Sequence, residues 1–200
     1  MEREVALLIA VFLNVHYEGK TYNTVQIGTQ CWLKENLDVG TRVNGSQNQT
    51  NNSTIEKYCY NDLESNCDTN GGLYQWNEAM QYSITPGTRG ICPPGWHIPT
   101  NAEFEALAAA VNNDGNALKA IGQGSGGGAG TNTSGFSALL AGYRDYDGFF
   151  NNLSSNAFFW SSSENGSSFA RHVYLYYLSA NIFFGYNYKE VGFSVRCEKD

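Results

Sequence analysis

The stretch from Tyr143 to Phe193 most constrains what this chain can fold into. It is a quarter of the sequence, yet it contains 16 of the 28 Phe, Tyr and Trp residues. Val173, Leu175 and Tyr177 alternate with His172, Tyr174, Tyr176 and Leu178, which is the period of a half-buried β-strand. The residues 179–181 (Ser-Ala-Asn) predict a turn, and a second strand is expected from Ile182.

Both faces of this predicted sheet are rich in apolar rings. A sheet with one solvated face should carry polar residues at alternate positions, but here Tyr and Phe stand among Ser, Asn and Gly, a composition typical of antibody binding loops. Burial on both faces is the alternative, although so many buried tyrosines would need hydroxyl partners. Val173, Leu175, Phe193 and Val195 already supply a core face, so the other parity is expected outside. We therefore predict a contiguous, largely exposed patch made of Phe169, His172, Tyr174, Tyr176, Phe183, Tyr186 and Tyr188.

Charge and length narrow the classes of partner. Two hundred residues suffice for one sizeable core, and the net charge is −7 with only 12 Lys and Arg residues spread thinly. Because no basic stripe exists, nucleic acid is not an expected partner.

Five cysteines favour an oxidising compartment. The short spacing of Cys59 and Cys67 predicts a small disulfide loop, and a second bridge is predicted from Cys92 to Cys197, which leaves Cys31 as the free thiol. Zinc is disfavoured, since no Cys-x₂-Cys pair occurs and only three histidines are present. We predict no metal and no cofactor, and an extracellular, cell-surface or virion location.

The longest apolar run is residues 5–13, and it is too short to span a bilayer, which takes about 20 residues. A signal-peptide core stays open as an interpretation, although only Arg3 gives the preceding residues positive charge. We expect residues 1–16 to form a buried strand or short helix that packs on the domain or on another subunit. The domain itself is expected over 17–200.

Local signals predict several further elements. Tyr17 to Tyr22 is a hairpin signal, and residues 40–56 are a polar, turn-rich loop. Apolar spacing predicts helices near 72–82 and 101–112, the second begun by a capping box of Thr100 and Glu103. Strands are expected over 158–163 and 192–197.

Five segments together resemble the Fibrobacter succinogenes major paralogous domain. They are Cys31-Trp-Leu-Lys-Glu-Asn-Leu37, Tyr74-Gln-Trp-Asn-Glu-Ala79, Gly90-Ile-Cys-Pro-Pro-Gly-Trp-His-Ile-Pro-Thr100, Phe159-Trp-Ser-Ser-Ser-Glu164 and the C-terminal Gly192 to Asp200. The segments around Trp76, Thr100 and Gly192 are also similar to the formylglycine-generating-enzyme branch of the C-type lectin fold. The resemblance implies an α+β domain with a C-type-lectin-like fold, in which two helices pack on a twisted antiparallel sheet with long irregular loops.

A second resemblance is to the variable proteins of diversity-generating retroelements, whose C-terminal region is randomised at template adenines. Region 144–191 would then be the binding region. Residues that look like outcomes of such randomisation are Tyr146, Phe150, Ser154, Phe158, Phe169, His172, Tyr174, Tyr176, Phe183, Phe184, Tyr186 and Tyr188. Between them stand fixed-looking residues, namely Trp160 to Ser163, Ala170-Arg171 and Gly192-Phe193.

These resemblances imply a non-enzymatic binding protein that recognises a protein or surface glycan, in which every variable-looking aromatic residue and His172 belongs to the ligand-binding set. The alternative is an adhesive or sugar-binding lectin-like module without diversification. Formylglycine chemistry uses a reactive cysteine pair near the C-terminal part of the fold, and here only Cys197 lies beyond Cys92. The calcium motifs of sugar-binding lectins are missing, with Trp76-Asn-Glu the nearest. No Ser/His/Asp arrangement can be assigned to His16, His97 or His172, so we predict no catalytic residue.

Overall fold

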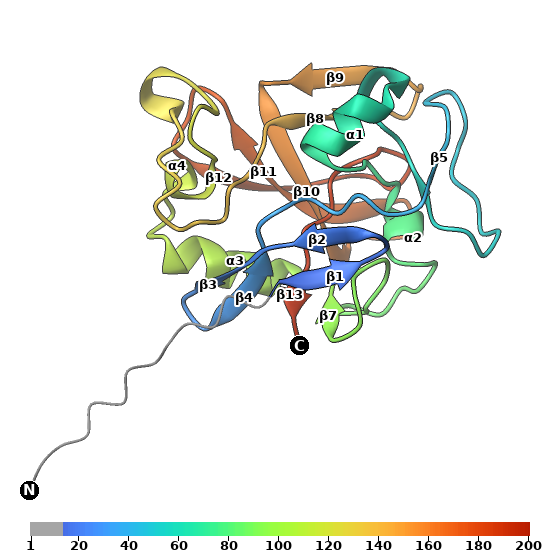
Figure 1. The fold of residues 1–200 in the computed structure, drawn as a ribbon, viewed down its shortest axis with the longest axis horizontal. Coiled ribbons are helices and arrows are strands. Elements are labelled where there is room, and N and C mark those ends of the chain that lie inside the picture. The colour runs from blue at the N-terminus through green and yellow to red at the C-terminus, as the bar shows by residue number, and fades with distance from the viewer. Residues whose placement is uncertain (1–13) are drawn as a thin grey trace, which may run out of the picture.

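The computed structural model describes residues 14–200 and shows an α+β protein (Figure 1). The predicted packing of the apolar run 5–13 lies outside the described residues. None of the helices within residues 14–200 has the length and apolar character needed to cross a membrane.

The strands form five small sheets. The largest are a three-stranded antiparallel sheet of β10 (Asn156–Glu164), β11 (Phe169–Tyr176) and β12 (Ile182–Tyr188), and a four-stranded sheet in the order β3 (Thr24–Ile27), β4 (Gln30–Leu33), β13 (Glu198–Lys199) and β7 (Trp96–His97). Three pairs complete the set: β1 (Val15–Tyr17) with β2 (Lys20–Tyr22), β5 (Thr41–Arg42) with β6 (Glu56–Lys57), and β8 (Ala141–Arg144) with β9 (Phe150–Leu153). The predicted hairpin at Tyr17 is confirmed, and so is a second strand from Ile182. The strand predicted over 172–178 pairs with it but ends at Tyr176, and residues 177–178 already belong to the turn.

Residues 192–197 were predicted as a strand, but they make only isolated bridges, from Gly192 to Arg144, from Phe193 to Tyr74 and from Ser194 to Phe159. The segment crosses between elements instead of lying along one partner. It is nonetheless buried along its whole length, as the predicted core role of Phe193, Val195 and Cys197 requires.

The α-helices number four within the described residues, where two were expected, and all but one are short. They are α1 (Glu64–Asn70), α2 (Trp76–Ala79), α3 (Asn101–Ala110) and α4 (Gly115–Leu118), with 3₁₀ turns at Tyr60–Asp62 and Gly126–Gly128. The helix predicted over 72–82 shrinks to α2, because Gln81 and Tyr82 adopt positive φ values of 49° and 60°. Those left-handed values cannot continue an α-helix.

The capping box of α3 is confirmed. The Thr100 hydroxyl accepts from the Glu103 backbone N–H at 3.3 Å, and the Thr100 N–H donates to the Glu103 carboxylate at 2.6 Å. The helix ends at Ala110, two residues before the predicted end, since Asn112 and Asn113 take positive φ values.

Two core clusters lie on opposite faces of the three-stranded sheet. Under α3, Phe104 and Leu107 pack with Phe159, Val173 and Leu175. A second cluster, on the other face, gathers around Trp76, Trp160, Ala170 and Phe193. Each face of β11 is therefore buried over only part of its length. The position of an aromatic residue along the strand thus decides whether it is buried or exposed.

Both predicted disulfides are present, Cys59–Cys67 and Cys92–Cys197, and Cys31 is free. Two bridges are typical of proteins in an oxidising compartment. The longer bridge closes 105 residues and lies in the same core cluster as Trp76 and Phe193.

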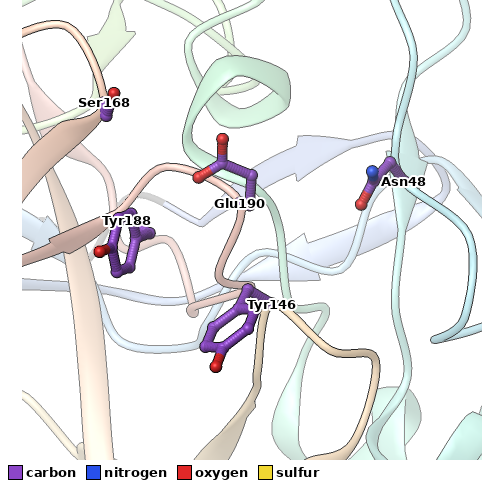
Figure 2. A pocket seen from close by; sticks show the side chains of 5 residues that line it. All are labelled: Asn48, Tyr146, Ser168, Tyr188 and Glu190. Carbon is purple, nitrogen blue, oxygen red and sulfur yellow. The ribbon is translucent and has the colours of Figure 1, made fainter.

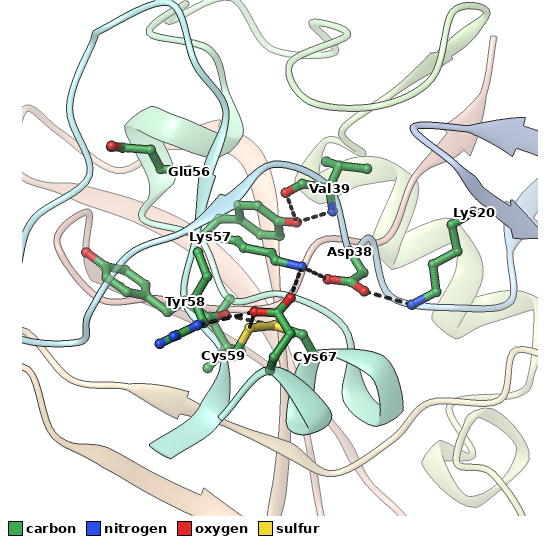
Figure 3. A network of polar contacts seen from close by, with 12 residues as sticks. Lys20, Asp38, Val39, Glu56, Lys57, Tyr58, Cys59 and Cys67 are labelled. Atoms are coloured by element: carbon green, nitrogen blue, oxygen red, sulfur yellow. Dashed lines mark hydrogen bonds and ion pairs between the residues drawn. A yellow bond between two sulfur atoms is a disulfide. The ribbon is translucent and has the colours of Figure 1, made fainter. Parts of the chain in front are cut away.

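A network of charged groups lies beside the shorter disulfide (Figure 3). The Asp38 carboxylate accepts from Lys20 at 2.9 Å and from Lys57 at 2.6 Å, and Lys57 also reaches Glu64 at 2.9 Å. The Asp38 and Lys57 side chains at its centre are both 8% exposed, whereas Lys20 and Glu64 lie at its exposed ends. It joins the start of the polar loop 40–56 to its end, because Asp38 precedes the loop and Lys57 follows it.

Candidate binding surface

The structure distributes the predicted binding residues over three levels of exposure. Tyr146, Phe184, Tyr186 and Tyr188 are exposed, at 64%, 39%, 60% and 47%. The half-buried ones are Phe150, Phe158, Phe169, Tyr174, Tyr176 and Phe183, and His172 is buried at 5%. The exposed residues come from β12 and from the turn between β8 and β9.

One group of rings, which we call the aromatic edge, consists of Tyr146, Phe169, Tyr186 and Tyr188. Phe169 lies opposite Tyr188 in the β11–β12 register, with ring centroids 4.5 Å apart, and 5.7 Å from Tyr186. Tyr146 reaches Tyr188 from the β8–β9 turn at 6.2 Å. Phe184 precedes Tyr186 by two residues on β12 and extends the same face. The aromatic edge is thus a contiguous surface built from three separate segments.

A second group, the aromatic stack, lies on the other face of the sheet. Its rings follow one another from the core to the surface as Phe193, Phe158, Tyr174 and Phe183, with centroid separations of 4.7, 5.5 and 4.8 Å. Phe193 is fully buried and Phe183 half-buried, so the stack has one end in the core and the other at the surface.

The prediction of one patch from one parity was therefore wrong. Phe169, Tyr186 and Tyr188 share a face with Val173 and Leu175, whereas Tyr174 and Tyr176 share the opposite face with His172. The reason is that α3 packs on the first face only at Val173 and Leu175, while Phe193 covers the second face at Phe158, Trp160 and His172.

His172 was expected on the exposed patch and is instead a packed core residue. Its ring lies 5.0 Å from Phe193 and 6.2 Å from Trp160. Burial lowers the pKa of His172 to about 4, and its Nδ1 has no hydrogen-bond partner among the described residues. Gly185 lies opposite it in β12, and a Cβ there would come within 3.2 Å of the imidazole. The neutral imidazole therefore packs against Gly185, and a larger residue at position 185 would crowd it.

Phe150 also lies away from the aromatic edge. Its ring is 5.4 Å from Tyr60, and it packs against the small cluster of Tyr58, Tyr60 and Leu73. It therefore contacts the protein itself more than solvent.

A pocket of about 490 Å³ opens at the end of the aromatic edge (Figure 2). Its lining residues come from four parts of the chain: Asn48, Tyr146, Ser168, and Tyr188 with Glu190. The sequence predictions included the two tyrosines and missed the polar members. Asn48 lies in the polar loop, within an Asn-x-Thr glycosylation sequon, and Glu190 lies just beyond β12; no sequence pattern marks either as a pocket residue.

Two buried side chains join the backbone at Glu190 to the loop that carries Asn48. Arg144 is 2% exposed and donates to the carbonyls of Gly45 at 2.8 Å and Glu190 at 3.0 Å. Gln75 donates to the Glu190 carbonyl at 2.8 Å and to the Asn48 side-chain oxygen at 3.0 Å. Sequence reasoning missed both, because each works through contacts between residues far apart in the chain.

Two groups of side chains within residues 14–200 could offer three metal-ligand atoms each, and one of them includes the disulfide-bonded Cys59 and Cys67. The other is His97, Glu103 and Glu198. His97 pairs with Glu103 at 3.2 Å and with Asp200 at 2.8 Å, and Glu198 accepts from Gln30 at 3.0 Å. Burial and the neighbouring Glu103 raise the pKa of Glu198 to about 7. This cluster ties β7, β13 and the capping box of α3 together, which is a structural role.

The fold and the surface together define a small disulfide-bridged α+β domain with an aromatic, pocketed edge. The chain belongs to the family of the Fibrobacter succinogenes major domain, whose family model matches residues 25–199. No curated protein and no solved structure was found to match it.

Proposed function

We propose that this protein is a non-enzymatic binding protein that recognises a macromolecular target through the aromatic edge, and that it is a retroelement-diversified variable protein on a C-type-lectin-like fold. The observation that carries the proposal is the cluster of exposed rings from Tyr146, Tyr186 and Tyr188, joined by half-buried Phe169. Exposed apolar clusters mark interaction sites, and tyrosine is prominent among residues that dominate binding energy.

The pattern of burial supports diversification. Fixed-looking Trp160, Ser161, Ser162, Ala170 and Phe193 are all at most 1% exposed. The variable-looking residues are exposed or half-buried, with His172 the exception; among the fixed-looking ones, Ser163 is half-buried and Arg171 is exposed. A surface that can change its residues while the core beneath stays constant suits a protein whose target changes.

The C-type-lectin-like fold is part of the proposal and has separate support. Strands from the two ends of the described chain lie next to each other, since β4 pairs with β13 through Trp32 and Glu198. Between these strands the chain makes long irregular excursions. One of them, the polar loop 40–56, places Asn48 in the pocket at the end of the aromatic edge.

An array of extracellular proteins and glycans, probed with labelled protein, tests the proposed function. We expect wild type to bind at least one array member and the Phe184→Ser/Tyr186→Ser variant to lose that binding, because central anchors can each contribute about 2 kcal/mol or more. The matched control is Leu63→Ser/Ile84→Ser, which removes exposed apolar side chains elsewhere and should bind normally.

Thermal melts of all three proteins should agree closely, because surface substitutions usually change stability by less than about 0.5 kcal/mol. Equal loss of binding in both double variants would contradict recognition by the aromatic edge. The diversification part has its own test, a near-identical DNA repeat beside a reverse transcriptase gene that differs from this gene at template adenines.

A further inference from the structure

The pocket at the end of the aromatic edge has a lining that the proposed function does not by itself explain. Glu190 lies between the Tyr188 strand end and the Asn48 loop, with Tyr146 across from it (Figure 2). Glu190 is exposed, and none of residues 14–200 makes a hydrogen bond or ion pair to its carboxylate. An acidic group with free oxygens therefore lines the same pocket as two tyrosine rings.

The geometry of the two rings suits a flat cation. Tyr146 and Tyr188 meet edge to face, with centroids 6.2 Å apart and planes inclined at 63°, so their contact does not cover both ring faces as a parallel stack would. A cation over a tyrosine face is attracted by the ring quadrupole. A guanidinium group can stack on one ring and still present its planar donors to a carboxylate, which an ammonium group cannot do as well.

Hydrogen bonds and ring contacts within the protein hold the pocket lining in place before any ligand binds. Arg144 and Gln75 hold the Glu190 backbone through its carbonyl, at 3.0 and 2.8 Å, and the same two side chains hold the loop that carries Asn48. Phe169, at 4.5 Å, supports the Tyr188 ring from behind. A pre-organised site loses less entropy on binding than a mobile one.

Apart from Arg171, which is exposed opposite Tyr186 on the same face of the sheet, the charged groups around the pocket are acidic or already compensated. Lys189 is buried, pairs with Glu164 and lies over the Trp76 ring, so its charge is already compensated. The Arg144 guanidinium opposes a second cation, but it is buried beneath the floor, donates to carbonyls and is covered by the Tyr58 ring. Asp145 and Asp147 flank Tyr146, and the protein carries a net charge of −7.

We propose that this pocket binds an arginine side chain of a protein partner. The inference rests on the proposed function, because it assigns a chemical class to one part of the target that the aromatic edge would contact. The guanidinium would stack against Tyr146 or Tyr188 and donate to the Glu190 carboxylate, with Asn48 and Ser168 as polar neighbours at the rim.

Two small peptides test the charge requirement without knowledge of the target. They are acetyl-Gly-Arg-Gly-amide and the same peptide with citrulline, which has nearly the shape of arginine but no charge. In NMR titrations of the full chain, we expect the arginine peptide to shift signals of Tyr146, Tyr188 and Glu190, and to bind roughly fivefold to tenfold more tightly than the citrulline peptide. Its binding should weaken with added salt.

Three variants test the residues. Glu190→Gln should reduce affinity for the arginine peptide to that for the citrulline peptide, and Tyr188→Ser should reduce it as well. Ile84→Ser is the matched control, since it removes an exposed apolar side chain that belongs neither to the aromatic edge nor to the pocket lining. Thermal melts accompany each variant, so that loss of fold is told apart from loss of binding.

Equal binding of the two peptides, or an unchanged affinity in Glu190→Gln, would overturn the arginine site. The arginine site would also be overturned if a neutral oligosaccharide shifted the signals of these residues and the arginine peptide did not. These outcomes would not affect the result of the array experiment. Conversely, if Phe184→Ser/Tyr186→Ser bound the array as wild type does, the peptide result would still stand. The two proposals can therefore fail separately.

Discussion

Among single residues, Asp38 links the charged network to pH most directly. Burial alone would raise the pKa of Asp38, but hydrogen bonds from Lys20 and Lys57 outweigh it and lower the pKa below its usual value. A carboxyl group with a lowered folded-state pKa stabilises the fold above its unfolded-state pKa, and that stability is lost as the pH falls through the folded-state pKa. The network should therefore weaken in acid, below about pH 4.

The substitution Asp38→Asn should lower the free energy of unfolding at pH 7 by roughly 3 kcal/mol, since it leaves the buried Lys57 with one carboxylate in place of two. Urea unfolding at pH 7 and pH 3 measures this, and the difference from wild type should shrink at the lower pH. Glu64→Gln is the control: its side chain is 54% exposed, so its loss should cost less than about 1 kcal/mol. A difference that is independent of pH would contradict the role of Asp38.

At the scale of the secondary-structure elements, α3 depends on its capping box. Thr100→Ala removes the hydroxyl that accepts from the Glu103 N–H and should cost about 1 kcal/mol. For a chain of this length that corresponds to a fall of about 2–4 °C in the midpoint of a thermal melt. Thr100→Ser keeps the acceptor and should melt close to wild type, so equal falls in both variants would contradict the cap.

The elements that could be predicted are those whose signals are local. The capping box and the Tyr17 hairpin each depend on residues a few positions apart, and both are where the sequence placed them. Helix α1 lacks apolar periodicity; it begins inside the loop closed by Cys59 and Cys67 and continues past Cys67 to Asn70. Strand parity could be predicted along β11, but which end of each face is covered depends on α3 and on residues 191–195, which are distant in sequence. For the same reason His172 was misplaced and Glu190 was missed.

For the whole molecule, the two disulfides should differ in what they contribute. On the chain-entropy model, a bridge over 105 residues stabilises by about 4.7 kcal/mol and one over 8 residues by about 2.5 kcal/mol. The paired variant Cys92→Ser/Cys197→Ser should therefore unfold at a clearly lower urea concentration than Cys59→Ser/Cys67→Ser. The reverse order would contradict the model. Thiol titration of the denatured, unreduced wild type should find one group, that of Cys31.

The pairing of β4 with β13 has a kinetic consequence. Trp32 and Glu198 face each other across this sheet, so a strand made early in synthesis must wait for one made 166 residues later. Contacts between such distant residues slow folding, because the loop must close before the contact can form. The hairpins of the chain can form as they leave the ribosome, but the four-stranded sheet cannot be completed until residue 199 has been synthesised. Until then Trp32 and Leu33, both fully buried in the native fold, lack part of their cover and depend on what else shields them.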